Sequence, residues 1–170
     1  MLIALTGTPG TGKSTVADEL EKRGHFIIRV NDTIKEFVIE RDEERDAQIV
    51  DIDRWCAEFP YTHGIAEGHL SHLLSADRII VLRCRPDHLK ARLIERGYHT
   101  EKIDENVEAE LLDVIMIEAL EEHTPEQIYE YDATDKTVTE VADMVENIIA
   151  GTIPPKHGHV DWLSVCADLL

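Results

Sequence analysis

A run of residues near the N-terminus has the types and the spacing of a phosphate-binding loop. The run from Gly7 to Ser14 reads G-T-P-G-T-G-K-S and fits the pattern G-x-x-x-x-G-K-S. Its inner glycines, Gly10 and Gly12, allow backbone angles and a close approach that a Cβ would block. We expect Lys13 to reach the β- and γ-phosphates of a bound nucleotide and the Ser14 hydroxyl to hold Mg²⁺. The motif therefore predicts binding of a nucleoside triphosphate.

The residues on either side of this loop must present it as an anion site. The apolar run 2–5 is typical of a short buried strand, and the segment 15–20 places Val16, Ala17 and Leu20 on one face of a helix. In such a strand–loop–helix unit the backbone N–H groups point inward and the helix dipole favours negative charge. A chance glycine-rich turn is the alternative interpretation, and this context disfavours it.

Strand and helix patterns alternate along the rest of the chain. We predict strands at 2–5, 26–30, 64–66, 78–82 and 127–132, and helices at 15–23, 32–40, 86–96, 103–123 and 137–150, with a short amphipathic helix in the tail 160–170. This alternation predicts an α/β fold of the P-loop NTPase type, in which a five-stranded parallel sheet carries helices on both faces. The charged segment 41–54 interrupts the alternation, and we expect a mobile insertion there.

The composition limits the class of protein. The chain has 170 residues and a formal net charge of -18, which indicates one domain and disfavours direct binding of DNA. Such acidity fits a basic protein partner as well as an ordinary solvated surface. The three cysteines, Cys56, Cys84 and Cys166, are widely spaced, which indicates reduced thiols and a cytoplasmic location. Because there is no long apolar run and the N-terminus starts with a strand pattern, we expect neither a membrane span nor a signal peptide.

Beyond the loop, several shorter runs carry a resemblance to a known family. The residues concerned are Gly7–Thr15, Asn31-Asp32, Asp51–Arg54, Glu67–His69, Val81–Arg83, Arg92-Leu93, Arg96–Tyr98, Lys102 and Glu105–Val107. With these residues the chain resembles the nucleoside monophosphate kinases and, more narrowly, the adenylate kinase isoenzyme 6 family, which comprises the eukaryotic nuclear ATPase/adenylate kinase and its archaeal relatives.

The resemblance implies a domain organisation. A P-loop kinase domain would occupy residues 1–150, with an NMP-binding insertion at about 30–53 and a lid at about 97–107. A C-terminal extension would follow at 151–170, without any chemistry that its residues suggest. We expect the pair Trp162-Leu163 in this extension to be covered by the protein's own surface.

The resemblance also implies that ATP and Mg²⁺ bind around the loop. The ATP-binding residues would be those of the loop and a lid arginine: Gly10, Gly12, Lys13, Ser14, Thr15 and Arg96. Lys13 and Arg96 would be catalytic, because phosphoryl transfer depends on positioning and on neutralisation of charge. Mg²⁺ would be held by Ser14 and by Glu67, which follows the third strand pattern. For Arg96, which ends a helix, the alternative is a cation that only faces the helix dipole.

The remaining implied residues belong to the acceptor side and to hydrolysis. AMP would bind to Asp32 and to Lys35, which stands where relatives place an arginine; an exposed helix lysine is the alternative. His69 would be catalytic by orienting a water molecule or contacting the transferred phosphoryl group, and a structural histidine is the alternative. We expect His72 to be only a helix residue, and Arg92 either assists the lid or forms a surface salt bridge.

The activity that the resemblance implies is that of an adenylate kinase. ATP and AMP would give two molecules of ADP, with ATP hydrolysis as a side activity. The resemblance further implies a role in maturation of the small ribosomal subunit, through binding of a small-subunit ribosomal protein. Two alternatives stay open. One is an ATP-dependent assembly switch that binds and releases such a protein while AMP turnover is incidental. The other is a kinase for another small metabolite, such as another nucleoside monophosphate.

Overall fold

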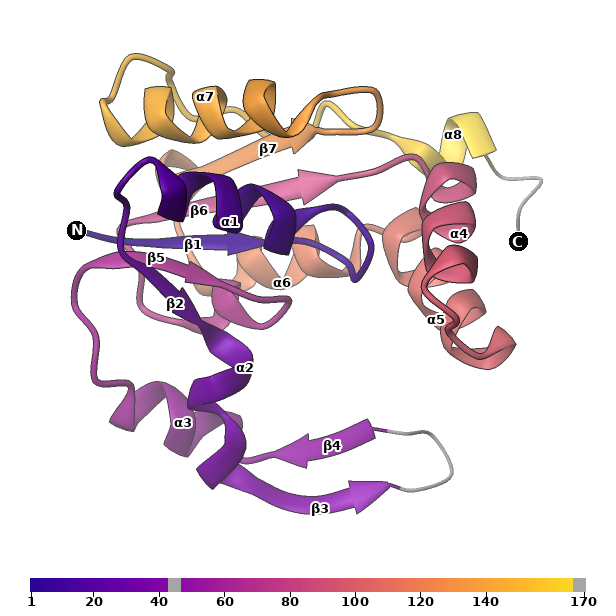
Figure 1. The fold of residues 1–170 in the computed structure, drawn as a ribbon, viewed down its shortest axis with the longest axis horizontal. Helices are drawn as coiled ribbons and strands as arrows, with labels where there is room; N and C mark the ends of the chain where they lie inside the picture. Colours follow the sequence, from indigo (N-terminus) through magenta and orange to yellow (C-terminus); the bar gives the residue numbers. More distant parts are fainter. Residues whose placement is uncertain (43–46, 167–170) are drawn as a thin grey trace.

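The strands of the main layer form one open parallel sheet (Figure 1). The computed structural model describes residues 1–42 and 47–166, and within them five strands pair in the order β2-β5-β1-β6-β7. These strands are β1 (Leu2–Thr6), β2 (Ile27–Arg29), β5 (Gly64–Glu67), β6 (Arg78–Arg83) and β7 (Ile128–Asp132). Every neighbouring pair is parallel, so the carboxyl ends of the strands meet at one edge. The predicted five-stranded parallel sheet is confirmed.

Helices cover both faces of the sheet, as the alternation of patterns predicts. One face carries α1 (Lys13–Lys22) and α7 (Val138–Ile149), and the other carries α6 (Val114–Glu122), whose core is joined by α3 (Ile52–Glu58) from beyond β2. Successive strand residues point to opposite faces. Leu5 of β1 therefore packs in the core under α1 and α7, whereas Ala4 packs in the core under α6. None of the helices within residues 1–42 and 47–166 is long and apolar enough to cross a membrane.

Two further helices pair beside the carboxyl edge of the sheet. These are α4 (Pro86–Glu95) and α5 (Thr100–Leu111), on the right of Figure 1. A separate apolar cluster joins them: Cys84, Leu89, Leu93, Ile103 and Val107. The predicted lid, 97–107, is the turn between these helices together with much of α5, so it lies next to the phosphate loop.

The insertion differs from its prediction. In place of one helix at 32–40, the chain forms short turns of helix and then an antiparallel ribbon: α2 (Val30–Thr33), η1 (Lys35–Phe37), β3 (Val38–Asp42) and β4 (Ala47–Val50). The helix prediction is wrong from Val38 onward, because Val38 and Ile39 are β-branched and Val38 pairs with Val50 of the second strand. Residues 43–46 of the segment that we expected to be mobile lie outside the described residues.

The long helix predicted at 103–123 is two helices. α5 ends at Leu111, and α6 begins at Val114 after Asp113 adopts a left-handed conformation with a φ of 57°. Aspartate tolerates this conformation better than most residues, and the Asp113 carboxylate forms an ion pair with Arg83 of β6. Because the apolar period continues across the turn, periodicity alone predicts an unbroken helix.

The C-terminal extension folds back onto the edge of the sheet. Lys156 forms an isolated bridge with Tyr129 of β7. α8 (Trp162–Cys166) follows, and the predicted residues 167–170 of this helix lie outside the described part of the chain. Trp162 is only 8% exposed, which confirms that it is covered by the protein itself, whereas Leu163 is 45% exposed and that expectation is wrong.

Candidate active site

The phosphate loop connects β1 to α1 at the carboxyl edge of the sheet. Gly10 and Gly12 adopt φ angles of 98° and 100°, in the left-handed region that favours glycine. A Cβ at Gly10 would also lie 2.8 Å from Cδ1 of Leu89. α1 begins at Lys13, directly after the loop, so its free N–H groups face the space that the loop encloses. The local geometry fits an anion site.

Lys13 is folded into the loop. Its Nζ atom donates to the carbonyl oxygens of Gly7 (2.6 Å) and Thr8 (3.0 Å), and the residue is only 7% exposed. Burial lowers the pKa of Lys13 to about 8, while the carboxylates of Glu67 and Glu110 act in the opposite direction. A phosphate in the loop would replace the carbonyl contacts with a full negative charge, so anion binding would favour the charged ammonium.

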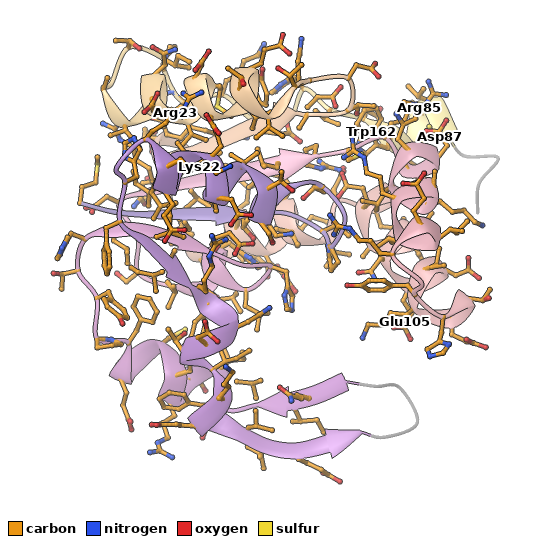
Figure 2. All side chains as sticks on the ribbon, viewed as in Figure 1. Lys22, Arg23, Arg85, Asp87, Glu105 and Trp162 are labelled. Carbon is orange, nitrogen blue, oxygen red and sulfur yellow. The ribbon has the colours of Figure 1, made fainter. Side chains whose placement is uncertain are left out.

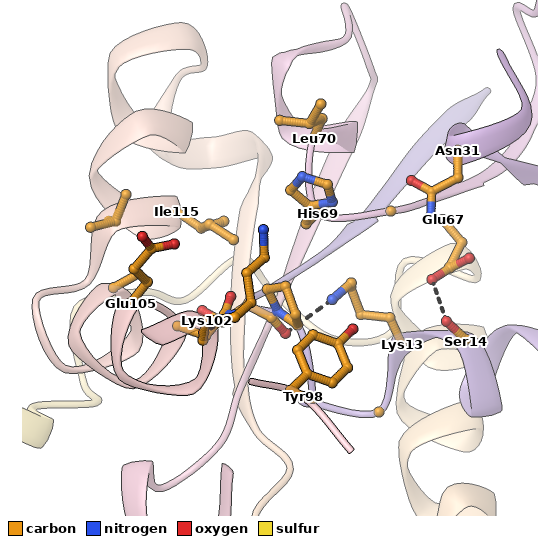
Figure 3. Close-up of a pocket in the computed structure, with 18 of the residues that line it drawn as sticks. Lys13, Ser14, Asn31, Glu67, His69, Leu70, Tyr98, Lys102, Glu105 and Ile115 are labelled. Atoms are coloured by element: carbon orange, nitrogen blue, oxygen red, sulfur yellow. Dashed lines mark hydrogen bonds between the residues drawn. The ribbon is translucent and has the colours of Figure 1, made fainter. Parts of the chain in front are cut away.

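Ser14 and Glu67 meet at the mouth of the loop (Figure 3). Ser14 Oγ donates to Oε1 of Glu67 at 2.9 Å, and Arg29 contacts the other carboxylate oxygen at 3.3 Å. Register explains the encounter, because Glu67 ends β5 and pairs with Leu5 of β1, two residues before Gly7. A hydroxyl and a carboxylate are the oxygen ligands that Mg²⁺ prefers, and Mg²⁺ usually keeps several waters and phosphate oxygens. The described residues contain no cluster of three or more histidine, cysteine or acidic side chains that could hold a metal ion without such help.

His69 follows the same strand and faces the same space. Burial and the nearby charge of Lys13 lower the pKa of His69 to about 4, so its ring is neutral at pH 7. The neighbouring His72 is fully buried in the 3-10 helix η2 (Ser71–Leu73), where its ring nitrogens contact Thr6 Oγ1 (3.1 Å) and Glu118 Oε2 (2.9 Å). His72 is a helix residue, as expected, and its buried ring also joins β1 to α6. Its partner Glu118 belongs to α6, and no local pattern connects the two.

Two cavities flank the loop. The larger has a volume of about 580 Å³, and it collects most of the predicted residues, including Gly10, Gly12, Lys13, Ser14, Glu67, His69 and Arg96. The smaller, of about 170 Å³, lies between the loop and the segment after β7, and it is lined by Thr15, Arg92, Ala133 and Lys136 among others. Arg96 lines both cavities. The loop thus has open space on two sides, and the same residue, Arg96, borders both spaces.

Arg92 is bound to the loop rather than to a surface carboxylate. Its guanidinium donates to the carbonyl of Gly10 at 3.3 Å and to the carbonyl of Thr134 at 3.1 Å. Arg92 therefore joins α4, the phosphate loop and the segment after β7 around the smaller cavity. Of the two interpretations of this residue, the geometry favours assistance to the site.

The two residues predicted to bind AMP lie away from the cavities. Lys35 Nζ pairs with Oδ1 of Asp32 at 2.5 Å, and both side chains are about two-thirds exposed, at 69% and 67%. Neither lines the larger cavity, although the preceding Asn31 does. Binding of AMP to Asp32 and Lys35 stays a prediction, and it would require the insertion to move toward the loop.

The wall opposite the loop comes from the segment that was predicted to form the lid (Figure 3). Tyr98, Lys102, Glu105 and Asn106 line the larger cavity from the turn before α5 and from α5 itself. Lys102 adds a further cation to a space that is already lined by Lys13 and Arg96. The motif K-x-x-E-N was a weak signal for these residues, because it does not show which face of the helix is turned toward the loop.

Comparison with known proteins yields a family and a fold. The AAA domain family matches residues 3–113. A protein of Archaeoglobus fulgidus named "Putative adenylate kinase" is 47% identical over 172 residues, which cover 99% of this chain and 95% of that protein. A Pyrococcus furiosus protein of the same name is 44% identical over 178 residues, with 100% and 96% covered. The deoxyadenosine kinase from M. mycoides with bound dATP is similar in structure, with a TM-score of 0.56 at 16% identity over 88% of this chain and 99% of that one, which shows the fold alone.

Proposed function

We propose that this chain, which belongs to the AAA domain family and to the family of the archaeal proteins named above, is an adenylate kinase that transfers the γ-phosphoryl group of ATP to AMP. One observation carries this proposal: the phosphate loop lies between two cavities, and Arg96 lines both. A phosphoryl transferase must hold a donor and an acceptor on opposite sides of the moving group. The volume of the larger cavity, about 580 Å³, lies within the usual range for small-molecule sites.

In this mechanism the chain positions phosphates and neutralises their charge. Lys13 exchanges its two carbonyl contacts for oxygens of the β- and γ-phosphates. Arg96 spans donor and acceptor and stabilises the charge on the transferred group. Mg²⁺, held by Ser14 and Glu67 together with phosphate and water, would supply further charge neutralisation. The donor lies on the side of the smaller cavity, with its adenine ring near Ala133.

In this proposal, His69 orients a water molecule and does not act as a base that removes a proton. With a pKa of about 4 it is a weak base at neutral pH, but its neutral ring can still accept or donate one hydrogen bond. Such a ring can hold a water molecule near the γ-phosphate, which would give the ATPase side activity that the resemblance implies. AMP would enter the larger cavity, where Lys102 and Asn31 lie on opposite walls, and the insertion with Asp32 and Lys35 would close over it.

The decisive test is ADP formation from ATP with and without a nucleotide acceptor. We expect AMP to raise the rate of ADP formation above the rate of hydrolysis alone. A panel of acceptors in the same assay, with AMP, GMP, CMP, UMP and dAMP, identifies the substrate. If no acceptor raises the rate, the protein is not a nucleoside monophosphate kinase.

A partner extends this proposal. The net charge of -18 suits a basic protein, and we infer from the resemblance a cytoplasmic role in small-subunit maturation through a ribosomal protein. The exposed position of Lys35 and Asp32 favours the second candidate, an ATP-dependent assembly switch, because it leaves the acceptor side without its predicted contacts. Titration of purified small-subunit ribosomal proteins at moderate salt, with ATP and with ADP, tests both. Binding that ATP or ADP changes, without AMP-dependent turnover, would favour the switch.

A further inference from the structure

A buried ionic cluster lies next to the site but outside the mechanism above. Arg83, at the end of β6, is 2% exposed and is surrounded by three carboxylates. Its guanidinium contacts Glu110 (2.9 Å), Glu130 (2.7 Å) and Asp113. Burial opposes the charge of Arg83, but Glu110 and Asp113 raise the pKa of this arginine above its ordinary value. Removing Arg83 would leave the buried carboxylates of Glu110 and Glu130 without this cation.

Glu110 connects this cluster to the phosphate loop. One of its oxygens, Oε2, accepts a hydrogen bond from Thr8 Oγ1 at 2.5 Å. The other, Oε1, accepts from the Nε atom of Arg83 (2.9 Å), from the backbone N–H of Cys84 (3.0 Å) and from Nε1 of Trp162 (3.1 Å). A single carboxylate therefore joins the loop, β6, α5 and the C-terminal extension.

Thr8 is the loop residue through which this carboxylate can act. The carbonyl oxygen of Thr8 accepts one of the two hydrogen bonds of Lys13 Nζ, and it also accepts from the backbone N–H and Oγ1 of Thr11. Anchoring the Thr8 side chain thus fixes the carbonyl that holds Lys13 before nucleotide binds. Because donor groups bind phosphate best when they are already in position, this anchor affects the affinity of the loop.

The C-terminal extension is also attached to this cluster at Glu130, and this attachment helps to bring Trp162 to Glu110. Glu130 donates its backbone N–H to the carbonyl of Lys156 at 2.8 Å, and its side chain accepts from the backbone N–H of His159 at 3.1 Å. Trp162 then packs on Leu111 in a small cluster with Cys166. Figure 2 places Trp162 where α8 meets the rest of the molecule. The indole N–H thus reaches Glu110 only when this segment is docked.

We propose that Glu110 is a positioning residue of the phosphate loop, and that Trp162, by donating to Glu110, makes nucleotide affinity at the loop depend on docking of the C-terminal extension. Glu110 touches neither nucleotide nor metal in this role, and it acts through Thr8. The inference rests on the proposed function only in that the loop binds a nucleoside triphosphate. A partner that displaced the extension would thereby weaken ATP binding.

The first experiment measures the Kd of ATP in the presence of Mg²⁺, without AMP, for Trp162→Phe. This change keeps an aromatic ring in the apolar cluster and removes the N–H donor. We expect the Kd to rise roughly threefold to tenfold, the scale of one partly transmitted hydrogen bond to a charged group. Cys166→Ala is the matched control, because it loosens the same cluster without touching Glu110. Equal Kd values for wild type and a folded Trp162→Phe would overturn the proposal, and so would equal shifts in both variants.

A double-mutant cycle then tests whether the effect of Trp162 on ATP binding passes through Glu110 and Thr8. Thr8→Val removes the hydroxyl that Glu110 holds, and Thr8 and Trp162 share no hydrogen bond with each other. If Trp162 acts through Glu110 and Thr8, the effect of Trp162→Phe on the Kd should largely vanish in the Thr8→Val background. Independent, multiplying effects would show that Trp162 acts by another route and would overturn the proposal.

A spectroscopic measurement covers the case in which Trp162→Phe does not fold. The chain has two tryptophans, and Trp55→Phe leaves Trp162 as the single indole fluorophore. Coupling between two sites is reciprocal, so ATP should change the Trp162 emission along the same binding curve that ATP itself follows. Emission that stays constant through saturation with ATP would overturn the proposal. None of these readouts needs AMP, so a failed kinase assay would end the proposed function and leave this inference standing.

Discussion

The donor side and the acceptor side of the site are held by different kinds of contact. The phosphate loop is attached to the core by a buried hydrogen bond between Thr8 and Glu110, and its lysine is 7% exposed. Within the described residues, the insertion packs on the core near its base, where Phe37 and Val50 contact the apolar cluster and the buried Trp55 donates to Thr33 Oγ1 at 2.9 Å. Farther out, the ribbon of β3 and β4 projects away from the sheet (Figure 1).

This difference separates a fixed donor site from an acceptor site that must close. On the ribbon, Ile39 and Ile49 are 68% and 49% exposed, so it gains little from apolar burial in the present arrangement. Segments with few buried contacts open and move at low cost, and closing segments are drawn from them. Variants of the loop should therefore abolish turnover, whereas variants of the insertion should change the use of AMP and leave ATP binding unaffected.

The largest effect is expected for Lys13→Ala. Loss of the ammonium removes the main cation at the transferred group, and kcat/KM should fall by at least about a hundredfold to a thousandfold. Because burial disfavours the charge of Lys13, the fold should tolerate the change, and thermal unfolding monitored by circular dichroism checks this. Lys22→Ala, at an exposed lysine of the same helix, is the control. A normal rate for Lys13→Ala would remove the loop from the mechanism.

The next effect separates Arg92 of α4 from Arg96, which directly follows this helix. Arg96 lines both cavities, so Arg96→Ala should lower kcat and raise the KM of ATP and of AMP, with kcat/KM reduced roughly tenfold to a hundredfold. Arg92 borders only the smaller cavity, so Arg92→Ala should raise the KM of ATP and spare that of AMP. Steady-state kinetics with each substrate varied in turn test this contrast. Identical profiles for the two variants would show that Arg96 does not bridge donor and acceptor.

A smaller effect is expected at His69, which lines the larger cavity together with Lys13 of the loop. His69→Asn should lower the rate of ATP hydrolysis about tenfold while changing the Kd of ATP by less, because an oriented water matters only for hydrolysis. Isothermal titration gives the Kd and a phosphate-release assay gives the rate. Equal losses in both would make the histidine structural.

The same variant tests the state of the ring through the pH dependence of stability. The pKa of His69 falls from its ordinary 6.5 to about 4 on folding, so between these values the unfolded chain binds the extra proton. The free energy of unfolding of the wild type therefore decreases as pH falls through this window, by roughly 1–3 kcal/mol from this group alone. Denaturant titrations should show a shallower decrease for His69→Asn. Parallel pH profiles would mean that the ring is not desolvated.

These contrasts also indicate how much of the molecule local sequence can predict. Most strands were predictable because they are short apolar runs, and the loop was predictable because its glycines and Lys13 form one contiguous motif. The break at Asp113 was not predictable, since the ion-pair partner of Asp113 is Arg83, which is distant in the sequence. The pairing of His72 with Glu118 was not predictable for the same reason, because Glu118 lies on another helix.

The insertion was the least predictable part of the fold. Asn31-Asp32 suggested the start of a helix and the charged run 41–54 suggested a mobile segment, but strand β3 forms, with Val38 opposite Val50 across the ribbon. Pairing between segments decides the structure there, and local propensity is too weak to show it. The acceptor residues are consequently the part of the site on which the sequence and the described geometry agree least.

The smallest expected effect concerns Lys35, one of the two predicted acceptor residues. Lys35 is paired with Asp32 at the surface, so Lys35→Ala should change the free energy of unfolding by no more than about 0.5 kcal/mol. If the insertion closes over AMP, the same change removes a cation from the acceptor phosphate and raises the KM of AMP several-fold, roughly threefold to tenfold, with the KM of ATP unchanged. Lys90→Ala, which removes an exposed lysine of α4, controls for the loss of surface charge. An unchanged KM of AMP would assign the acceptor to the lid side of the cavity, around Lys102, and would leave the insertion available for a protein partner.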